Sequence, residues 1–327
     1  MSAVTQGGVE FVKINRLSLS PITIIKSIRM IRKIIKKKKI DIVHCHHRMA
    51  GLYMKFYRFF HKIPVVYTLH LADIPSDFIH RLMTDTGDMA IGVSSEVSRF
   101  MIEKLGIQKE KVVTIYNGVD CDELGELSQE EKERLRRKWE IPEDKIILAL
   151  HSRIEEVKNH MLVVKTAAEL SDKTKEKLLF LCSGTREGSY YKKMKTAIKN
   201  YGLEDEFRFV GWSKTREILG TADLLILPST KEGFGLSVAE AFLLRKPVVR
   251  TRTAGFDDQR FCIPIRHDDT IDLKNILNRI AEDGIDKVYE NVEEAYQYAK
   301  ENFTVEAMTR KTVLLYETVA GKKRGIK

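Results

Sequence analysis

Short apolar runs alternate along this chain with longer segments whose apolar residues recur at helical spacing. In the first part, runs with the length and bounding residues of strands lie at Val9–Ile14, Ile40–Cys45, Pro64–Leu69, Met89–Val93 and Lys111–Tyr116. Helices are predicted between them, over the basic stretch Lys26–Lys39 and over Met49–His61 and Ser95–Leu105. Strands and helices in alternation predict parallel sheets that are covered on both faces.

The same alternation begins again near residue 145. Strands are predicted at Lys145–His151, Leu178–Cys182, Phe207–Val210, Leu224–Leu227 and Pro247–Thr251. Helices are predicted at Glu126–Arg137, Asn159–Leu170 and Tyr190–Tyr201, and Thr304 caps a last helix that reaches about Ala320. A chain of 327 residues is long enough for two cores. We therefore predict α/β domains at residues 1–122 and 123–327, with the last helix, about 304–320, as a candidate to pack back on the first domain.

The stretch from residue 222 to 250 is the most informative part of the chain. Its first predicted strand is stopped by Pro228 and is followed by a loop with Glu232, Gly233 and Gly235, after which a helix begins near Ser237. A second strand follows, so the stretch is a βαβ unit. Its glycine loop lies at the carboxyl end of the first strand, where open α/β sheets bind ligands.

Two chemistries are open for this loop. The backbone amides of Gly235, Leu236 and Ser237 would be free at a helix N-terminus, which suits a phosphate. The carboxylates of Glu232 and Glu240 beside such a phosphate suggest a ligand with hydroxyls, such as a nucleotide sugar. Alternatively, Ser237 and Glu240 form only a capping box, and the glycines form only a turn.

Two cations follow the first strand of the second part. Arg153 and Lys158 lie in a loop at a carboxyl end of a strand, where they can hold a diphosphate. The alternative is an exposed loop whose cations pair with Glu155 and Glu156.

Histidines mark two strand ends of the first part. His46 ends the run Ile40–Cys45, and His70 ends the run Pro64–Leu69. Two such ends in one sheet suggest a cleft, so these side chains are candidates beyond simple packing. Ser94, Ser95 and Glu96 are predicted only to cap a helix.

The net charge of +10 is concentrated near the N-terminus. Residues 1–62 hold fourteen Lys or Arg and two acids, and the excess is densest in Lys26–Lys39, where isoleucines recur at helical spacing. A basic amphipathic helix is typical of a membrane-surface element, and the alternative is a surface helix with solvated charges. The local excess favours contact with an anionic membrane. No nucleic-acid motif accompanies it, so nucleic acid is not expected as a partner.

The remaining composition narrows the setting. The four cysteines are scattered without a C-x-x-C pair, which predicts neither a zinc site nor a disulfide framework. The start lacks a secretory signal, and no apolar run is long enough to cross a bilayer. We expect a cytoplasmic protein, either free or peripheral at the inner membrane face.

With these residues in view, the chain resembles the family 4 retaining glycosyltransferases of the GT-B fold over nearly all its length. The residues that carry the resemblance are Asp41–His46, Thr68–His70, Val93–Ser95, Ile115–Asp120, Arg153 with Lys158, Phe209–Gly211, and Glu232–Leu236 through Glu240. In the last segment, Glu232 and Glu240 form the family's E-x7-E signature. The resemblance implies two Rossmann-like, doubly wound domains with a cleft between them. It also implies hexosyl transfer with retention from a nucleotide-diphosphate sugar, with a UDP-sugar favoured, to a glycan or lipid-linked acceptor in cell-surface polysaccharide or glycolipid synthesis.

The resemblance also implies a role for each site residue. Its catalytic candidates are Glu232, His70, Arg153 and Lys158, and its donor-binding candidates are Arg153, Lys158, Gly211, Trp212, Gly233, Phe234, Gly235, Leu236 and Glu240. Glu232 would contact sugar hydroxyls, Glu240 the ribose diol, and the two cations the diphosphate. Trp212 either stacks on the base or packs in the core. No cofactor and no metal are expected, because cations and a helix end take the metal's place.

Two departures from the family pattern stand out. The usual first strand and glycine-rich loop do not precede Val9, so the first domain is expected to be incomplete. Thr253–Asp258 replaces a glycine pair and a Pro-Glu. A catalytically impaired nucleotide-binding remnant is therefore the main alternative, and a GT-B epimerase or phosphorylase is a third.

Overall fold

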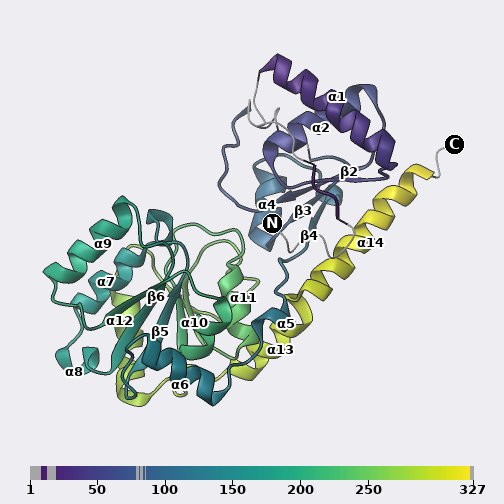
Figure 1. Cartoon of the computed structure of the whole chain (residues 1–327). Coiled ribbons are helices and arrows are strands. Elements are labelled where there is room, and N and C mark those ends of the chain that lie inside the picture. The colour runs from purple at the N-terminus through teal and green to yellow at the C-terminus, as the bar shows by residue number, and fades with distance from the viewer. Residues whose placement is uncertain (1–8, 13–19, 79–80, 82–83, 85, 325–327) are drawn as a thin grey trace. The chain divides into compact units, whose positions relative to one another are not determined.

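The computed structural model describes residues 9–12, 20–78, 81, 84 and 86–324 and divides into two compact units. The first comprises Met1–Gly92, Ser98–Val113 and Val313–Lys327, and the second comprises Val93–Val97 and Thr114–Thr312. Each unit is described by itself below (Figure 1). The domain boundary placed after residue 122 stays a prediction.

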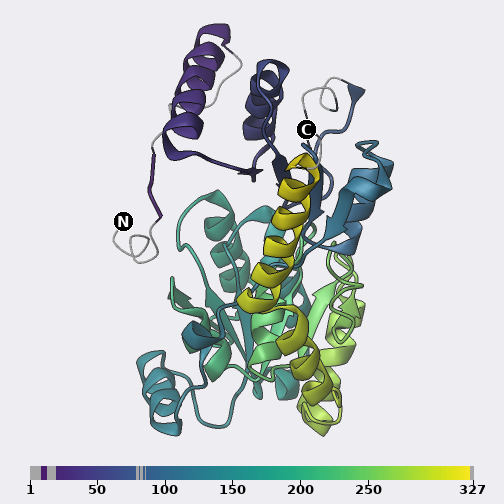
Figure 2. The ribbon, with the colours of Figure 1, turned by 90° about the vertical axis from the view of Figure 1, so that its right-hand side faces the viewer.

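The first unit is built on a four-stranded sheet in the order β1-β2-β3-β4. Its elements are α1 (Pro21–Lys38), β1 (Val43–Cys45), α2 (Arg48–Phe60), β2 (Val65–Leu69), β3 (Met89–Gly92), α4 (Ser95–Glu103), the 3-10 turn Lys109–Lys111 and β4 (Val112–Thr114). Strand β2 runs parallel to β1 and β3, and Val43 lies opposite Val65. Helices α1 and α2 lie side by side (Figures 1 and 2). The predicted basic helix is therefore confirmed.

The strand predicted at Val9–Ile14 is wrong where the structure describes it. Residues 9–12 form no regular structure, and Val9, Phe11 and Val12 are largely exposed. Lys13 and Ile14 lie outside the described residues. Alternating apolar residues favour a strand where one of its faces is buried, and the side chains of residues 9–12 are all exposed.

The second unit is built on a six-stranded parallel sheet in the order β10-β9-β8-β5-β6-β7. The strands are β5 (Ile146–His151), β6 (Leu178–Ser183), β7 (Phe207–Gly211), β8 (Leu224–Leu227), β9 (Val248–Thr251) and β10 (Ile263–Ile265). All five strands predicted here are confirmed, and β10 was not predicted. The chain adds β6 and β7 on one side of β5 and then places β8 on the other side. That reversal is a topological switch point, where open sheets bind ligands at the carboxyl ends of their strands.

Helices cover both faces of this sheet. The helices of the second unit are α5 (Cys121–Leu124), α6 (Gln129–Lys138), α7 (His160–Ala168), α8 (Asp172–Lys175), α9 (Ser189–Asn200), α10 (Thr215–Thr221), α11 (Leu236–Leu243), α12 (Ile271–Asp283) and α13 (Val292–Asn302), with a 3-10 turn at Glu156–Lys158. Helix α14 (Val305–Arg324) begins in this unit and ends in the first. Thr304 caps α14 as predicted, since its hydroxyl accepts a hydrogen bond from the Ala307 amide at 3.2 Å.

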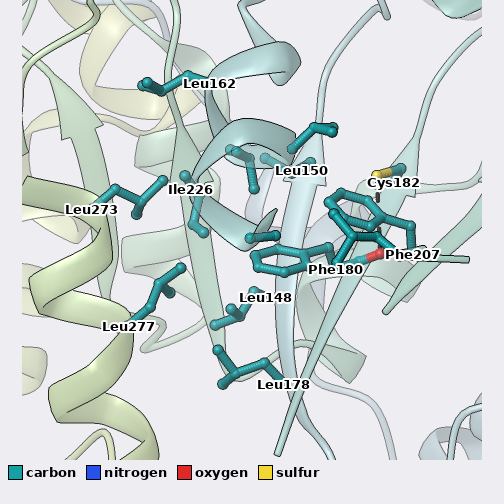
Figure 3. Packing of buried hydrophobic residues seen from close by; sticks show 14 of the residues in the cluster. Leu148, Leu150, Leu162, Leu178, Phe180, Cys182, Phe207, Ile226, Leu273 and Leu277 are labelled. Carbon is teal, nitrogen blue, oxygen red and sulfur yellow. Dashed lines mark hydrogen bonds between the residues drawn. The ribbon is translucent and has the colours of Figure 1, made fainter. Parts of the chain in front are cut away.

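The core of the second unit lies between the sheet and helices α7, α9 and α12 (Figure 3). Strand residues Leu148 and Phe180 pack there with Leu277 of α12, and each is at most 1% exposed. A fully buried Leu or Phe stabilises the fold by roughly 1.5–3 kcal/mol relative to an exposed one. This packing holds β5 and β8 rigidly side by side, and therefore also the loops that follow them.

Candidate functional site

The predicted donor residues gather at the carboxyl ends of β5, β7 and β8. Arg153 and Lys158 follow β5, and the loop with Glu232 follows β8, its direct neighbour in the sheet. The two loops are joined by backbone, because the Thr230 amide donates to the Val157 carbonyl at 2.9 Å. Residues separated by more than seventy positions in sequence are thus placed in one site.

Lys158 and Glu232 form a direct ion pair. The Lys158 Nζ donates to the Glu232 Oε1 at 2.6 Å, and their side chains are only 17% and 10% exposed. The alternative pairing of Lys158 with Glu156 is therefore wrong. An ammonium has three donors, so Lys158 can keep this carboxylate and still offer hydrogen bonds to a phosphate.

Arg153 lies apart from that pair. Its guanidinium donates to Glu155 at 3.0 Å, and the two side chains are 60% and 46% exposed. Within the described residues no hydrogen bond or ion pair joins Arg153 to Lys158 or Glu232. The expected exposed pair with Glu155 is thus present, and an exposed pair of this kind costs little to break.

The glycine loop leads directly into α11. Gly235 is the N-cap residue with φ of +82°, a conformation that favours glycine, and the helix begins at Leu236 without a side-chain cap. The capping box of Ser237 and Glu240 is therefore absent. Among the described residues no hydrogen bond is formed by the amides of Gly235, Leu236 and Ser237. They are the free donors that a helix N-terminus offers to an anion.

The side chain of Phe234 anchors this loop. It is 2% exposed and stacks on Tyr116 with ring centroids 5.6 Å apart. Its edge also meets Phe303 at 5.1 Å. Gly233 is buried beside it. Aromatic packing of Phe234 therefore fixes the loop that is predicted to hold a phosphate.

Glu240 lines a cavity of about 420 Å³ in the second unit. The lining residues are Gly118, Val119, Asp120, Glu123, Leu124, Lys214, Thr215, Arg216, Leu236 and Glu240. Burial raises the pKa of the Glu240 carboxyl to about 7, while a hydrogen bond from the Thr215 hydroxyl at 3.4 Å acts in the opposite direction. A half-buried carboxylate with little compensation is able to accept hydrogen bonds from ligand hydroxyls.

Gly211 ends β7, and Trp212 follows it. Gly211 has φ of +73°, and its carbonyl accepts hydrogen bonds from the Gly184 amide at 3.0 Å and the Ser183 hydroxyl at 3.2 Å. Trp212 is 67% exposed, so it is not packed in the core. Its stacking on a base stays a prediction.

The histidines of the first unit form a hydrogen-bonded group. His46 Nδ1 and His70 Nε2 are 3.0 Å apart, and His44 contacts the Thr68 hydroxyl at 2.6 Å and the Tyr316 hydroxyl at 2.5 Å. Burial, with the charges of its two neighbours, lowers the pKa of His44 to about 4, and burial also lowers the pKa of His46 and His70. The contact between the His46 and His70 rings fixes the two side chains relative to each other.

Several polar residues of the second unit were missed by sequence analysis. Ser94 caps the helix, since its hydroxyl accepts a hydrogen bond from the Val97 amide at 3.2 Å, whereas Ser95 and Glu96 have other partners. The Ser95 amide and hydroxyl each donate to Asp258 at 2.7 Å, and Glu96 accepts from the Gly255 amide at 2.9 Å. Tyr116 also donates to Asp258, at 2.9 Å. The only available signal was the unusual stretch Thr253–Asp258, whose partners are distant in sequence.

No helix among the described residues is both long and apolar enough to cross a membrane. In the same part of the chain, no group of three or more His, Cys, Asp or Glu side chains is placed to hold a metal ion. Metal-independent transfer stays a prediction.

Two parallel-sheet units with a site at a switch point define an α/β protein of GT-B type, and solved structures agree. A glycosyltransferase from Rickettsia africae ESF-5 superposes with a TM-score of 0.82 at 23% identity, covering 94% of this chain and 84% of that one. HepE of Anabaena, in complex with UDP, superposes with a TM-score of 0.78 at 20% identity, covering 91% and 82%.

Sequence comparison identifies the family. The family described as Glycosyltransferase Family 4 matches residues 4–123, and the family described as Glycosyl transferases group 1 matches residues 131–260. The chain belongs to these GT-B glycosyltransferases.

Two curated relatives show how far the likeness extends. The D-inositol 3-phosphate glycosyltransferase of Corynebacterium aurimucosum is 25% identical over 236 residues, which are 66% of this chain and 56% of that protein. The N-acetyl-alpha-D-glucosaminyl L-malate synthase of Bacillus anthracis is 26% identical over 305 residues, 88% of this chain and 76% of that protein. The chain thus spans little more than half the length of the first relative.

Proposed function

We propose that this protein transfers a hexose from a nucleotide-diphosphate sugar, with a UDP-sugar favoured, to a glycan or lipid-linked acceptor with retention of configuration. The observation that carries the proposal is the Lys158–Glu232 pair beside the free amides at the start of α11. A cation and free amides suit a diphosphate, and a carboxylate next to them suits sugar hydroxyls. Cell-surface polysaccharide or glycolipid synthesis is the setting that we propose.

Each site residue has a part in this proposal. Lys158 and the amides of Gly235 and Leu236 bind the diphosphate, and Arg153 leaves Glu155 to join them. Glu240 accepts hydrogen bonds from the ribose diol inside its cavity, and Trp212 stacks on the base. His70 of the first unit is proposed as a further catalytic residue.

The chemistry follows from where charge develops. As the bond from the sugar to the diphosphate breaks, the sugar gains oxocarbenium character and negative charge builds on the leaving phosphate. Donors that are already oriented toward that phosphate stabilise the charge without reorganisation. Lys158 and the α11 amides are held in this way by a rigid sheet, so we propose that no metal is needed.

The test is sugar transfer itself. The full chain would be incubated with UDP-, GDP- and ADP-sugars and polyprenyl or oligosaccharide acceptors, with the anomeric configuration of the product read by NMR. We expect turnover with a UDP-sugar and a large loss in Glu232→Ala. Nucleotide binding without any turnover, and without a further effect of Glu232→Ala, would instead favour the impaired remnant.

We also propose that an anionic membrane surface is a partner of the first unit. The basic side chains of α1 are exposed, among them Lys33, Lys36 and Lys37. Helix α2 ends with Phe59 and Phe60, which are 83% and 77% exposed. Because Val43 and Val65 are paired, the helices that end shortly before them both reach the amino edge of the sheet. Cationic and aromatic groups at one edge suit a headgroup region.

Vesicle co-sedimentation tests this partner. We expect binding to vesicles with phosphatidylglycerol, weak binding to pure phosphatidylcholine, and loss of binding in the charge reversal Lys33→Glu, Lys36→Glu, Lys37→Glu. A matched reversal of Lys192, Lys193 and Lys199, exposed on α9, should bind like the unmodified protein. Equal effects of the two triple variants, or vesicle binding that does not weaken with added salt, would exclude α1 as the membrane-binding surface.

A further inference from the structure

A cation lies buried directly beneath the glycine loop. Arg250 on β9 is 0% exposed, and its hydrogen bonds reach backbone carbonyls, the Thr253 hydroxyl and the Gln259 side-chain amide. No carboxylate among the described residues forms an ion pair with it. Burial lowers the pKa of Arg250, yet a guanidinium remains charged in proteins. A buried charge without a paired acid is costly and calls for an explanation.

Arg250 and Gln259 hold the carbonyl groups of the loop. Arg250 Nη1 makes a long contact of 3.4 Å with the Phe234 carbonyl, and Gln259 Nε2 donates to the Gly235 carbonyl at 3.1 Å. The Gly235 carbonyl also accepts from the Val238 amide of α11 at 3.0 Å. Gln259 Oε1 accepts in turn from Arg250. In a trans peptide the carbonyl and the following N–H point in opposite directions. Fixing these two carbonyls toward Arg250 and Gln259 therefore turns the N–H groups of Gly235 and Leu236 the other way.

The stretch that departs from the family pattern forms the surroundings of Arg250. Its Nη2 donates to the Thr253 hydroxyl at 2.9 Å and to the Ala254 carbonyl at 3.2 Å. Gly255, with φ of +87°, approaches so closely that an added Cβ would lie 2.3 Å from the Phe234 carbonyl oxygen. Glu96 holds the Gly255 amide from the other side. These contacts leave Arg250 little freedom to move.

We propose that Arg250 is a positioning residue for the donor diphosphate. It orients the Phe234 and Gly235 peptides so that the amides of Gly235 and Leu236 face the phosphates. Its charge forms no ion pair within the described residues and offsets the nearby charges of Glu232, Glu96 and Asp258. In a low-dielectric interior such a charge acts over a longer distance than it would in water. This inference rests on the proposed function, because it requires that a nucleoside diphosphate binds at the loop.

Calorimetric titration with UDP and with uridine tests the role. Uridine reaches only the nucleoside part of the site, whereas UDP also needs the oriented amides. We expect Arg250→Met to weaken UDP binding about tenfold or more and to leave uridine binding unchanged, and Arg250→Lys to restore part of the loss. A purely structural role would instead weaken both ligands alike, or neither, and would overturn the inference.

Two further variants keep the test decisive. Arg252→Met removes an exposed charge two positions away, so UDP binding should not change. A loss equal to that of Arg250→Met would mean a general charge effect. If Arg250→Met does not fold, Gln259→Leu decides. It removes one hydrogen bond to the Gly235 carbonyl and one partner of Arg250 but leaves the guanidinium in place, and it should also weaken UDP selectively. Absence of UDP binding by the unmodified protein counts against the proposed function and what rests on it, whereas unchanged UDP binding in the variants counts against the inference alone.

Discussion

At the scale of single residues, the chemistry of this site is decided by what each charged side chain is paired with. Lys158 and Glu232 neutralise each other with little exposure, whereas Arg153 has only an exposed partner. Within the described residues, the hydrogen-bond partner of the Glu240 carboxyl is the Thr215 hydroxyl at 3.4 Å. These charged residues were all predicted to bind the donor, but they differ in how far a neighbouring side chain compensates their charge.

Glu240→Gln should change how stability depends on pH. The pKa of the folded carboxyl is raised from an ordinary 4.5 to about 7, so its ionisation opposes folding. The penalty is absent below the lower value, grows between the two, and is complete above the higher one. For a half-buried group we expect about 2 kcal/mol, since each pKa unit is worth about 1.4 kcal/mol. Urea unfolding at pH 5 and pH 8 should show the unmodified protein losing stability relative to Glu240→Gln, and parallel curves would contradict this.

Lys158→Met and Glu232→Gln should separate binding from transfer. Lys158→Met removes the phosphate ligand, so we expect UDP affinity to fall at least tenfold. Glu232→Gln leaves the ammonium unneutralised and able to turn to phosphate, so UDP affinity should be kept or rise while transfer falls. Calorimetry and a transfer assay measure the two effects. Lys165→Met on α7, an exposed lysine, is a control that should change neither.

At the scale of elements, helix α11 has no side-chain cap at its N-terminus, so its first backbone amides remain available to a ligand. A side-chain cap would stabilise the helix by about 1 kcal/mol, and Gly235 supplies none. Helix ends that lack a cap usually have another partner for their donors. A bound phosphate is the partner that the proposed function provides.

Gly235→Ala should damage both stability and nucleotide binding. Its φ of +82° costs an alanine roughly 1–2 kcal/mol, and the new Cβ would lie 3.2 Å from the Arg250 guanidinium. Gly202→Ala has a comparable φ of +65° with nothing within 4 Å, so it should lower stability alone. Thermal unfolding and UDP titration distinguish the two variants. Equal UDP affinity in both would argue against a role of the loop in binding.

The elements were predicted best where they are buried. Strands β5, β6, β8 and β9 of the second unit are largely buried, and all four were found from their apolar runs. A strand covered on both faces needs apolar residues on both. Val9–Val12 shows the converse, since its apolar residues alternate but remain exposed. β10 has only three residues and includes Pro264, so its pattern is too short to detect.

At the scale of the whole molecule, the two units should respond differently to a donor. Hydrogen exchange with and without UDP should show added protection in the loops after β5 and β8 and at the start of α11. The strands β1 and β2 of the first unit should exchange as before, since neither holds a predicted nucleotide ligand. At a hundred times its Kd, UDP should stabilise the protein by about 2.7 kcal/mol. Protection confined to the first unit would contradict the assignment of the donor site.

The sequence by itself determined the alternation of strands and helices, the basic first helix, and the identity of Glu232, Glu240 and Lys158 as candidates. These follow from local periodicity and from motif residues, which need no knowledge of neighbours. Only the tertiary structure decided that Lys158 pairs with Glu232, that Glu240 forms no capping box, and that Arg250 lies under the glycine loop. Partners of this kind depend on β5 lying next to β8 and β9 next to β8, and strand order is a property of the whole sheet.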